Sequence, residues 1–296
     1  MTLTAPFPYF GGKRRAAPLV WDMIGDPGGY VEPFAGSAAV LLARPAFKGR
    51  RVETLNDADG WLVNAWRAIQ HAPEQVAAYA HGPVAEIDYH ARLAWLHERR
   101  DDALVSWLEG DPENHDPKAA GWWLYVLSCG IGDPFGGGPW RVIDGRLTDT
   151  RTLGDAGRGL TDYLIRLSAR LSRVRITCGD WKRVVQPSVT RATVGNGTRA
   201  IFLDPPYATS GDLYAHGDSD GTLSAEVRDW AASADPDLKI ILCGYDNEHD
   251  DLLDHGWSVV EGRAGGGAGY STRSDNGRRE RLWASPSCHL AQGVLL

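Results

Sequence analysis

The sequence predicts an α/β protein with a mostly parallel sheet and a mainly helical insert. In residues 30–70, and again from about residue 174, predicted strands end in acidic or glycine-containing turns and lead into helices, which is the βαβ pattern of a parallel sheet. Residues between these two parts lack the pattern and look helical. We therefore expect a sheet-forming domain from residues 1–70 and 175–296, interrupted by an insert at residues 71–174.

The first sheet-forming part begins with a strand around Tyr30 and Val31, a turn at residues 33–37 and a short helix from Ala38 to Ala43. A second strand, from Arg51 to Leu55, leads through acidic residues into another helix, whose apolar positions recur at helical spacing.

The insert contains two Gly/Pro-rich interruptions and ends in a strongly amphipathic helix, "GLTDYLIRLSARLSRV". Its apolar residues share one face, and Arg166, Arg170 and Arg173 share another. This arginine face is either simply solvated or a contact surface for nucleic acid.

The sheet pattern resumes with "VRITCGDW", "AIFLDPPY" and "KIILCGYDNEH", which predict strands, and with "LSAEVRDWAASA" and "DDLLDHG", which predict helices. The last two predicted strands, "WSVVEG" and "RRERLWAS", are joined by a long glycine-rich segment. We expect these two strands to be antiparallel. Arg273 and Arg278 in the connecting segment would touch DNA phosphates, or would lie at a solvated hairpin tip.

Composition narrows the class of protein. The four cysteines are widely spaced and the histidines show no HxxH or HExxH spacing, so we expect neither a disulfide framework nor a metal site. The apolar runs are shorter than a membrane span, and the N-terminus lacks the order of a signal peptide. These features predict a cytoplasmic protein, and the net charge of −7 argues mildly against a nucleic-acid partner.

The groups that suggest chemistry all follow predicted strands, where parallel sheets bind their ligands. Gly36 and its small neighbours would let a ligand approach the backbone closely. Asp57 follows the next strand, where an acidic residue binds ribose hydroxyls in nucleoside-binding sheets. Together they favour a nucleoside-bearing cofactor without a phosphate cradle, although "EPFAGSA" alone is also compatible with an ordinary turn.

The stretch "IFLDPPY" places a carboxylate, two prolines and an aromatic ring at the end of a buried strand. The Asp204 carboxylate and the Pro205 carbonyl would each accept an N–H bond from an exocyclic amine of a nucleobase. This would move the nitrogen towards tetrahedral geometry and free its lone pair to attack an activated methyl group. Pro206 would fix the loop, and Tyr207 would stack on a base taken out of its helix. The alternative is a structural turn between strand and helix.

DPPY, together with "YVEPFAGSAAV" and the N-terminal "PFPYFGGKRR", resembles the Dam-type (D12 class) DNA adenine-N6 methyltransferases, which use S-adenosylmethionine. The resemblance extends to "LNDADGWLVN", "CGDW" and "RRERLWASP" in both sheet-forming parts. It implies a Rossmann-like methyltransferase sheet, mostly parallel with an antiparallel C-terminal strand. It covers the insert poorly, and there the sequence does not locate the base-reading hairpin of the family.

The resemblance also implies roles for individual residues. The N-terminal segment would pack against the cofactor; it comprises Tyr9, Phe10, Gly11, Gly12 and Lys13. Lys13 would lie close to the cofactor carboxylate or to the catalytic loop. The turn after the first strand would wrap the methionine part and the ribose; it comprises Glu32, Pro33, Phe34, Ala35 and Gly36. Asp57 would bind the ribose hydroxyls, and Asp180 would face the cofactor adenine, with Trp181 beside it. The target adenine would be held by Asp204, Pro205, Pro206 and Tyr207. Ala38 stands where the family usually has a second glycine.

This reading predicts methylation of adenine N6 in double-stranded DNA at a short specific site, in a bacterial or phage-infected cell. A cognate restriction endonuclease is a partner that the resemblance allows. The same chemistry on RNA, and a non-catalytic nucleic-acid-binding protein on the same scaffold, remain alternatives. Cytosine-N4 transfer is a further one, although enzymes of that kind more often have Ser in place of Asp204.

Overall fold

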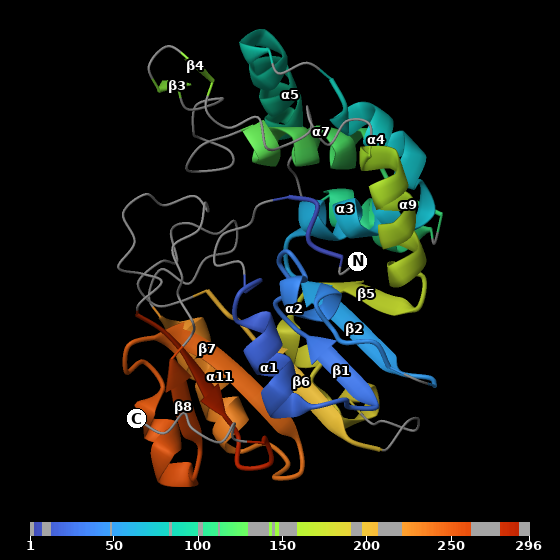
Figure 1. Cartoon of the computed structure of the whole chain (residues 1–296). Helices are drawn as coiled ribbons and strands as arrows, with labels where there is room; N and C mark the ends of the chain where they lie inside the picture. Colours follow the sequence, from blue (N-terminus) through green and yellow to red (C-terminus); the bar gives the residue numbers. More distant parts are fainter. Residues whose placement is uncertain are drawn as a thin grey trace. The chain divides into compact units, whose positions relative to one another are not determined.

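The computed structural model of the chain describes residues 3–7, 13–47, 49–82, 85–99, 103–111, 113–129, 142–143, 146–147, 159–190, 197–206, 221–261 and 279–289. The chain forms two compact units (Figure 1). The sheet unit comprises Met1–Thr4, Phe10–Ala58 and Gly179–Leu296, and the helical unit comprises Ala5–Tyr9 and Asp59–Cys178.

The strands form a mixed sheet in the order β5-β2-β1-β6-β7-β9-β8. Its members are β1 (Gly29–Glu32), β2 (Val52–Asp57), β5 (Val174–Cys178), β6 (Arg199–Leu203), β7 (Lys239–Tyr245), β8 (Ser258–Glu261) and β9 (Glu280–Ala284). β1 pairs in parallel with β2 and β6, and β6 pairs in parallel with β7. β9 is antiparallel to both β7 and β8. The expected Rossmann-like sheet, mostly parallel with an antiparallel C-terminal strand, is confirmed.

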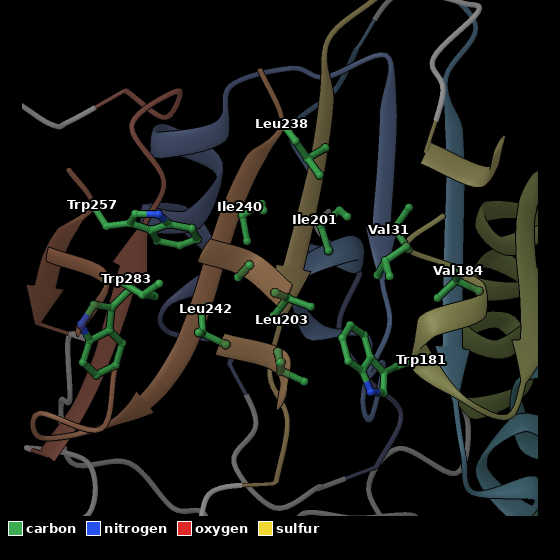
Figure 2. Close-up of a cluster of buried hydrophobic side chains, with 14 residues drawn as sticks. Val31, Trp181, Val184, Ile201, Leu203, Leu238, Ile240, Leu242, Trp257 and Trp283 are labelled. Atoms are coloured by element: carbon green, nitrogen blue, oxygen red, sulfur yellow. The ribbon is translucent and has the colours of Figure 1, made fainter. Parts of the chain in front are cut away.

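β6 and β7 contain continuous apolar runs because they are buried on both faces, and β1 is equally buried although it ends in Glu32. All four residues of β1 are buried, and so are the last four of β6. Side chains from β6, β7 and β9 pack with Trp181, Val227 and Trp257 in one hydrophobic cluster, shown in Figure 2. This core fixes the positions at which β1, β6 and β7 end.

The helices in the described parts of the sheet unit are short. They are α1 (Ala17–Ile24), α2 (Ala39–Leu42), α10 (Pro187–Thr190), α11 (Thr222–Ala232), and the 3-10 helices η1 (Trp181–Arg183) and η3 (Asp250–His255). α2 is shorter than the sequence predicted, because Ala38 has a left-handed φ of 50° and lies before the helix instead of in its first turn. The indole N–H of Trp21 in α1 donates to the Val40 carbonyl at 2.7 Å and links α1 to α2.

The helical unit contains α3 (Gly60–His71), α4 (Pro73–Ala80), α5 (Glu86–Glu98), α6 (Ala103–Gly110), α7 (Pro117–Cys129) and α9 (Leu160–Leu171). The expected amphipathic helix is α9, which buries Leu160, Leu164, Leu167 and Leu171 and packs against α3 and α4. The larger segment of the unit runs from Asp59 to Cys178, so the unit includes α3 and β5, which the division based on sequence grouped with the sheet-forming domain.

α7 packs closely on α4 at Gly121, where an added Cβ would lie 2.5 Å from the Tyr79 Cβ and 2.7 Å from the Val76 carbonyl oxygen. In addition, β3 (Val142–Ile143) and β4 (Arg146–Leu147) form a short antiparallel hairpin.

Candidate active site

The functional groups predicted from the sequence gather at one edge of the sheet unit. β1, β2 and β6 are parallel, so their carboxyl ends lie at the same edge. The turn that starts at Pro33 follows β1, Asp57 ends β2, and Asp204 follows β6. The sheet topology therefore brings together residues that are far apart in the sequence.

The turn after β1 is tight and is braced by β2. Gly36 and Ala38 have φ angles of 45° and 50°, in the left-handed region that favours glycine. The Ala35 N–H donates to the Asn56 carbonyl at 2.8 Å, and the Gly36 N–H donates to Asp57 Oδ2 at 3.0 Å. One oxygen of the half-buried Asp57 carboxylate thus fixes the turn that the resemblance assigns to the cofactor.

Asn56 connects three chain segments at this edge, and the sequence analysis did not identify it. Its side-chain Nδ2 donates at 2.9 Å to the carbonyl of Pro33, after β1, and at 2.9 Å to the carbonyl of Gly179. The Gly179 N–H in turn donates to the Asp57 carbonyl at 2.9 Å. Asn56 is buried, so both donor bonds are made away from water. Its only sequence signal was its position directly before Asp57 at the end of a predicted strand.

Asp180 and Trp181 follow the Gly179 contact directly. Asp180 is exposed, and its Oδ1 accepts from the Lys182 N–H at 2.8 Å, which caps η1. Trp181 is buried in the hydrophobic cluster, with its ring 6.0 Å from that of Phe34. The cap thus fixes Asp180 at the start of η1, directly before the buried Trp181.

Glu32 is held inside the protein beneath the turn. It is 2% exposed, and its Oε1 accepts from the Leu41 N–H at 2.6 Å and from the Tyr30 hydroxyl at 2.8 Å. Burial raises the pKa of the Glu32 carboxyl to about 8, against the two hydrogen bonds, which lower it, and with a smaller contribution from the Asp204 charge. In the described structure Glu32 therefore anchors α2 to β1.

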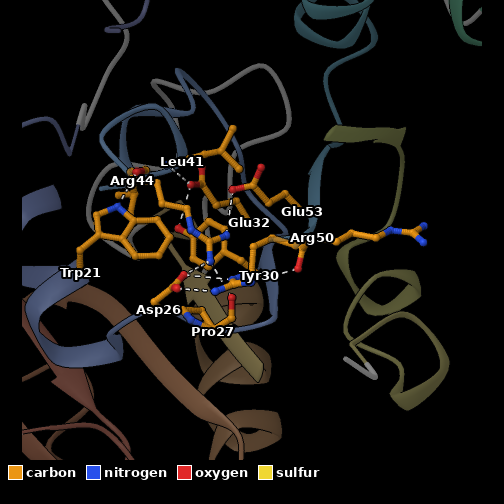
Figure 3. A network of polar contacts seen from close by, with 11 residues as sticks. Trp21, Asp26, Pro27, Tyr30, Glu32, Leu41, Arg44, Arg50 and Glu53 are labelled. Atoms are coloured by element: carbon orange, nitrogen blue, oxygen red, sulfur yellow. Dashed lines mark hydrogen bonds and ion pairs between the residues drawn. The ribbon is translucent and has the colours of Figure 1, made fainter. Parts of the chain in front are cut away.

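A buried arginine, Arg44, completes the polar network around Glu32 (Figure 3). Its Nη1 lies 2.9 Å from Glu53 Oε1, and its Nη2 lies 2.8 Å from Asp26 Oδ1 and 2.6 Å from the Pro27 carbonyl. The Arg44 side chain is only 1% exposed. Arg44 thus joins the segment after α2 to β2 and to the loop before β1.

Asp204, at the end of β6, is paired with a buried lysine. Lys13 Nζ lies 2.9 Å from Asp204 Oδ1 and 2.9 Å from Glu280 Oε1. The Lys13 ammonium thus contacts the first residue of the DPPY segment. The side chain of Lys13 is 3% exposed, whereas those of Asp204 and Glu280 are 20% and 21% exposed. Glu280 was another residue that the sequence analysis did not identify.

Cys243 and Tyr245 of β7 adjoin these charges. Burial raises the pKa of the Cys243 thiol well above its usual value, and the Asp204 carboxylate, which accepts a hydrogen bond from it, adds to the effect. Burial also raises the pKa of the Tyr245 phenol; Lys13 opposes the increase, and Glu280 and Asp204 add to it. We call Lys13, Asp204, Cys243, Tyr245 and Glu280 the lysine cluster.

The predicted site residues fall into three groups. Those brought to the sheet edge are Lys13, Glu32, Pro33, Phe34, Ala35, Gly36, Asp57, Asp180, Trp181, Asp204, Pro205 and Pro206. Those that lie outside the described residues are Tyr9, Phe10, Gly11, Gly12, Tyr207, Arg273 and Arg278. Arg166, Arg170 and Arg173 belong to the helical unit, where Arg166 and Arg173 are exposed and Arg170 is half-buried.

Three further observations concern cofactors and location. Among the described residues, there is no cluster of His, Cys, Asp and Glu side chains that could hold a metal ion. The four cysteines, Cys129, Cys178, Cys243 and Cys288, are not in disulfide bonds. No helix in the described parts of the chain has the length and apolar character needed to cross a membrane.

The residues at the sheet edge fit S-adenosylmethionine by the chemistry of their donors and acceptors. Asp57 and Asp180 offer carboxylate acceptors for hydroxyl and amine groups, and Phe34 and Trp181 offer an apolar wall. The left-handed turn at Gly36 allows a ligand to approach the backbone without a side chain in between.

The strand order and the antiparallel C-terminal strands are those of a Rossmann-like methyltransferase fold. Residues 9–89 match the family model of the D12 class N6 adenine-specific DNA methyltransferase, and this match confirms the resemblance to the Dam-type enzymes. Members of the matched family methylate adenine N6 in DNA, and the family implies S-adenosylmethionine as the methyl donor. The search of curated proteins gave no match.

Proposed function

We propose that this protein transfers a methyl group from S-adenosylmethionine to adenine N6 in duplex DNA, at a short specific site and on a base flipped out of the helix. The observation that carries the proposal is the meeting of the β1 turn, Asp57 and the Asp204 loop at one sheet edge. This is the edge where parallel sheets bind ligands. The match over residues 9–89 supports the choice of cofactor and base.

On the cofactor side, the proposal gives each group one task. Asp57, already fixed by the Gly36 N–H, accepts from ribose hydroxyls through its carboxylate. Asp180 accepts from the adenine amine of the cofactor, and Phe34 and Trp181 line the adenine. Asn56 keeps these segments in register through its bonds to Pro33 and Gly179. When bound, S-adenosylmethionine would supply the methyl group: the carbon–sulfur bond breaks with both electrons retained by the sulfur, the lone pair of adenine N6 forms the new nitrogen–carbon bond, and the methylated nitrogen loses one proton to solvent.

On the target side, Asp204 and the carbonyl of Pro205 each accept one N–H bond of the target amine. Pro206 restricts the loop, because its ring fixes φ. Holding both N–H bonds directs the nitrogen lone pair towards the methyl donor, and this positioning contributes much of the rate. Tyr207 stacks on the extruded base, which offsets part of the unstacking cost at about 1–3 kcal/mol per base.

We also propose that residues 71–174 recognise the target sequence. The β3–β4 hairpin lies within this insert and supports the assignment, since the family resemblance includes a base-reading hairpin. Arg166 and Arg173 expose guanidinium groups that would contact DNA phosphates, together with Arg170, and Arg273 and Arg278 would do the same from the segment before β9. Phosphate contacts position the protein, whereas base contacts specify the sequence.

The test is methyl transfer from labelled S-adenosylmethionine to random-sequence duplex DNA, followed by single-base detection of methylated adenines. Structured RNA competes as acceptor in the same reaction. We expect N6-methyladenine within one short DNA sequence, and loss of transfer in Asp204→Ala. The matched control is Asp235→Ala, which removes a surface carboxylate of the same unit that pairs with Arg199.

Three results would contradict the proposal, each in a different way. Preferential methylation of RNA would show that RNA is the substrate. Methylation of cytosine would show that cytosine is the target base. Cofactor binding without transfer to any nucleic acid would indicate a binding protein on a methyltransferase scaffold. Co-purification of an endonuclease that is blocked by this methylation would identify the protein as part of a restriction-modification pair.

A further inference from the structure

We infer that Glu280 is a positioning residue for methyl transfer: it shares the Lys13 ammonium with Asp204 and so preserves the negative charge with which Asp204 holds the target amine. The inference rests on the proposed function, but its electrostatic part can be measured without any nucleic acid.

The geometry places one buried cation between two carboxylates. Lys13 Nζ lies 2.9 Å from an oxygen of each acid, and the Lys13 side chain is 3% exposed. Each carboxylate is about one-fifth exposed, at 20% for Asp204 and 21% for Glu280. The ammonium is thus held by both acids, and the three groups together carry one net negative charge when all are ionised.

Strand pairing holds Glu280 in this position. β9 is antiparallel to β7, and Glu280 lies directly opposite Tyr245 in the register. β7 is parallel to β6, with Leu242 opposite Leu203, so Asp204 continues from the strand on the other side of β7. Glu280 and Asp204 therefore come from the two strands that flank β7, with Cys243 and Tyr245 of β7 adjacent to both.

The charge balance matters because of what the reaction asks of Asp204. The target nitrogen becomes more positive as its lone pair is used, and a nearby carboxylate stabilises that charge. An ammonium paired with Asp204 alone would neutralise this carboxylate in a site with little water, where such pairing is strong. Because Glu280 also pairs with the Lys13 ammonium, the carboxylate of Asp204 is neutralised less. Asp204 therefore remains a better acceptor for the N–H bonds of the target amine.

Arg279, the neighbour of Glu280, has a different partner. Its Nε donates to Asp246 Oδ2 at 2.7 Å, and its guanidinium lies 5.2 Å from the centre of the Tyr245 ring. These contacts direct the Arg279 guanidinium towards Asp246 and the Tyr245 ring.

The experiment compares the whole protein with Glu280→Gln, which removes the charge but keeps the size of the side chain. Single-turnover methylation of duplex DNA measures the chemical step apart from product release. We expect the rate to fall by roughly tenfold while the KM for S-adenosylmethionine stays nearly constant, since the lost interaction acts on the transition state. Glu280→Asp should recover part of the rate, because it restores a carboxylate.

The matched control is Glu261→Gln. Glu261 lies on β8, the other neighbour of β9, where it forms an exposed pair with Arg281 at 3.5 Å and takes no part in the lysine cluster. This variant should methylate at the parent rate. A loss in Glu261→Gln equal to that in Glu280→Gln would attribute the effect to the stability of β9 and overturn the inference.

A second measurement reports the charge without turnover. NMR titration of carbon-13-labelled tyrosine follows the Tyr245 phenol, with Tyr245→Phe to assign its signal. The negative charge of Glu280 contributes to the raised pKa of this phenol, so Glu280→Gln should lower the pKa. An unchanged pKa of Tyr245 would overturn the electrostatic argument. If Glu280→Gln does not fold, Glu280→Asp replaces it, and a smaller shift of the Tyr245 pKa is expected.

The two measurements separate failure of the inference from failure of the proposed function. If the parent methylates DNA and Glu280→Gln does so equally fast, Glu280 has no positioning role and the function stands. If the parent methylates no nucleic acid, the proposed function fails, and a lowered Tyr245 pKa still supports a shared Lys13 charge.

Discussion

Substitution of Glu32 by Gln tests whether the buried carboxyl beneath the β1 turn costs stability as the pH rises. Glu32 is 2% exposed and accepts from Tyr30 and Leu41 through one oxygen. Glutamine keeps an oxygen that can accept both bonds and removes the titrating proton. The variant therefore separates the effect of ionisation from the effect of the hydrogen bonds.

The sign follows from proton binding in the two states. Burial raises the pKa of Glu32 from 4.5 to about 8 in the folded protein. Between these values the folded protein holds a proton that the unfolded chain has released, so rising pH favours the unfolded chain. The stability contributed by the bound proton is complete below the unfolded pKa and is lost as the pH approaches the folded pKa.

The magnitude follows from the two pKa values. At about 1.4 kcal/mol for each pH unit, the full difference is on the order of 5 kcal/mol, and about 2 kcal/mol of it falls between roughly pH 6 and pH 8. The free energy of unfolding of Glu32→Gln, relative to the parent, should therefore rise by about 2 kcal/mol over this interval.

Urea unfolding of both proteins, followed by tryptophan fluorescence without cofactor, measures this difference at each pH. Taking the difference cancels the titration of other groups, such as His249, whose pKa burial lowers. Glu74→Gln serves as the control, because Glu74 is exposed on α4 in the helical unit. A difference between Glu32→Gln and the parent that does not change with pH would refute the reasoning.

Further predictions concern contacts that fix the fold. Asn56→Ala loses the two donor bonds of the Asn56 side chain, so the free energy of unfolding measured in urea should fall by about 2–3 kcal/mol. Calorimetry should show weaker binding of the cofactor. An unchanged unfolding free energy and an unchanged cofactor affinity would contradict the bracing role of Asn56. Gly121→Ala places a Cβ 2.5 Å from the Cβ of Tyr79 on α4 and should lower the free energy of unfolding in urea by about 1–3 kcal/mol or more. Gly110→Ala is the control, because a Cβ added at Gly110 meets no atom within 4 Å and should not lower this free energy. Arg44→Met leaves the carboxylate of Glu53 buried without its cation and should lower stability by about 3–5 kcal/mol; a melting temperature equal to the parent's would exclude this.

Much of the sheet was predictable because its signals are local. The apolar run at residues 200–203 and the one at residues 240–243 predicted buried strands, and the structure has β6 and β7 there. The antiparallel end of the sheet was also predictable, since β8 and β9 follow one another along the chain. Helix α9 was predictable from the spacing of its leucines.

The residues that sequence analysis missed act through partners distant in the sequence. Asn56 bonds to the carbonyl of Gly179, which is 123 positions away. Glu280 pairs with Lys13, which lies near the opposite end of the chain, and no local pattern connects the two. The match to the family model ends at residue 89, so it includes Lys13 but neither of its acidic partners.

The sequence by itself determined which strands are buried and which chemical groups end them, because burial patterns and turn residues act over a few neighbouring positions. It thereby determined that carboxylates would gather at the carboxyl edge of a parallel sheet. Only the tertiary structure decided how those carboxylates are charged and held. It buried Glu32 under the turn and placed Lys13 between Asp204 and Glu280. The physical reason is that desolvation and ion pairing depend on distances across the sheet, which are set by strand order and register.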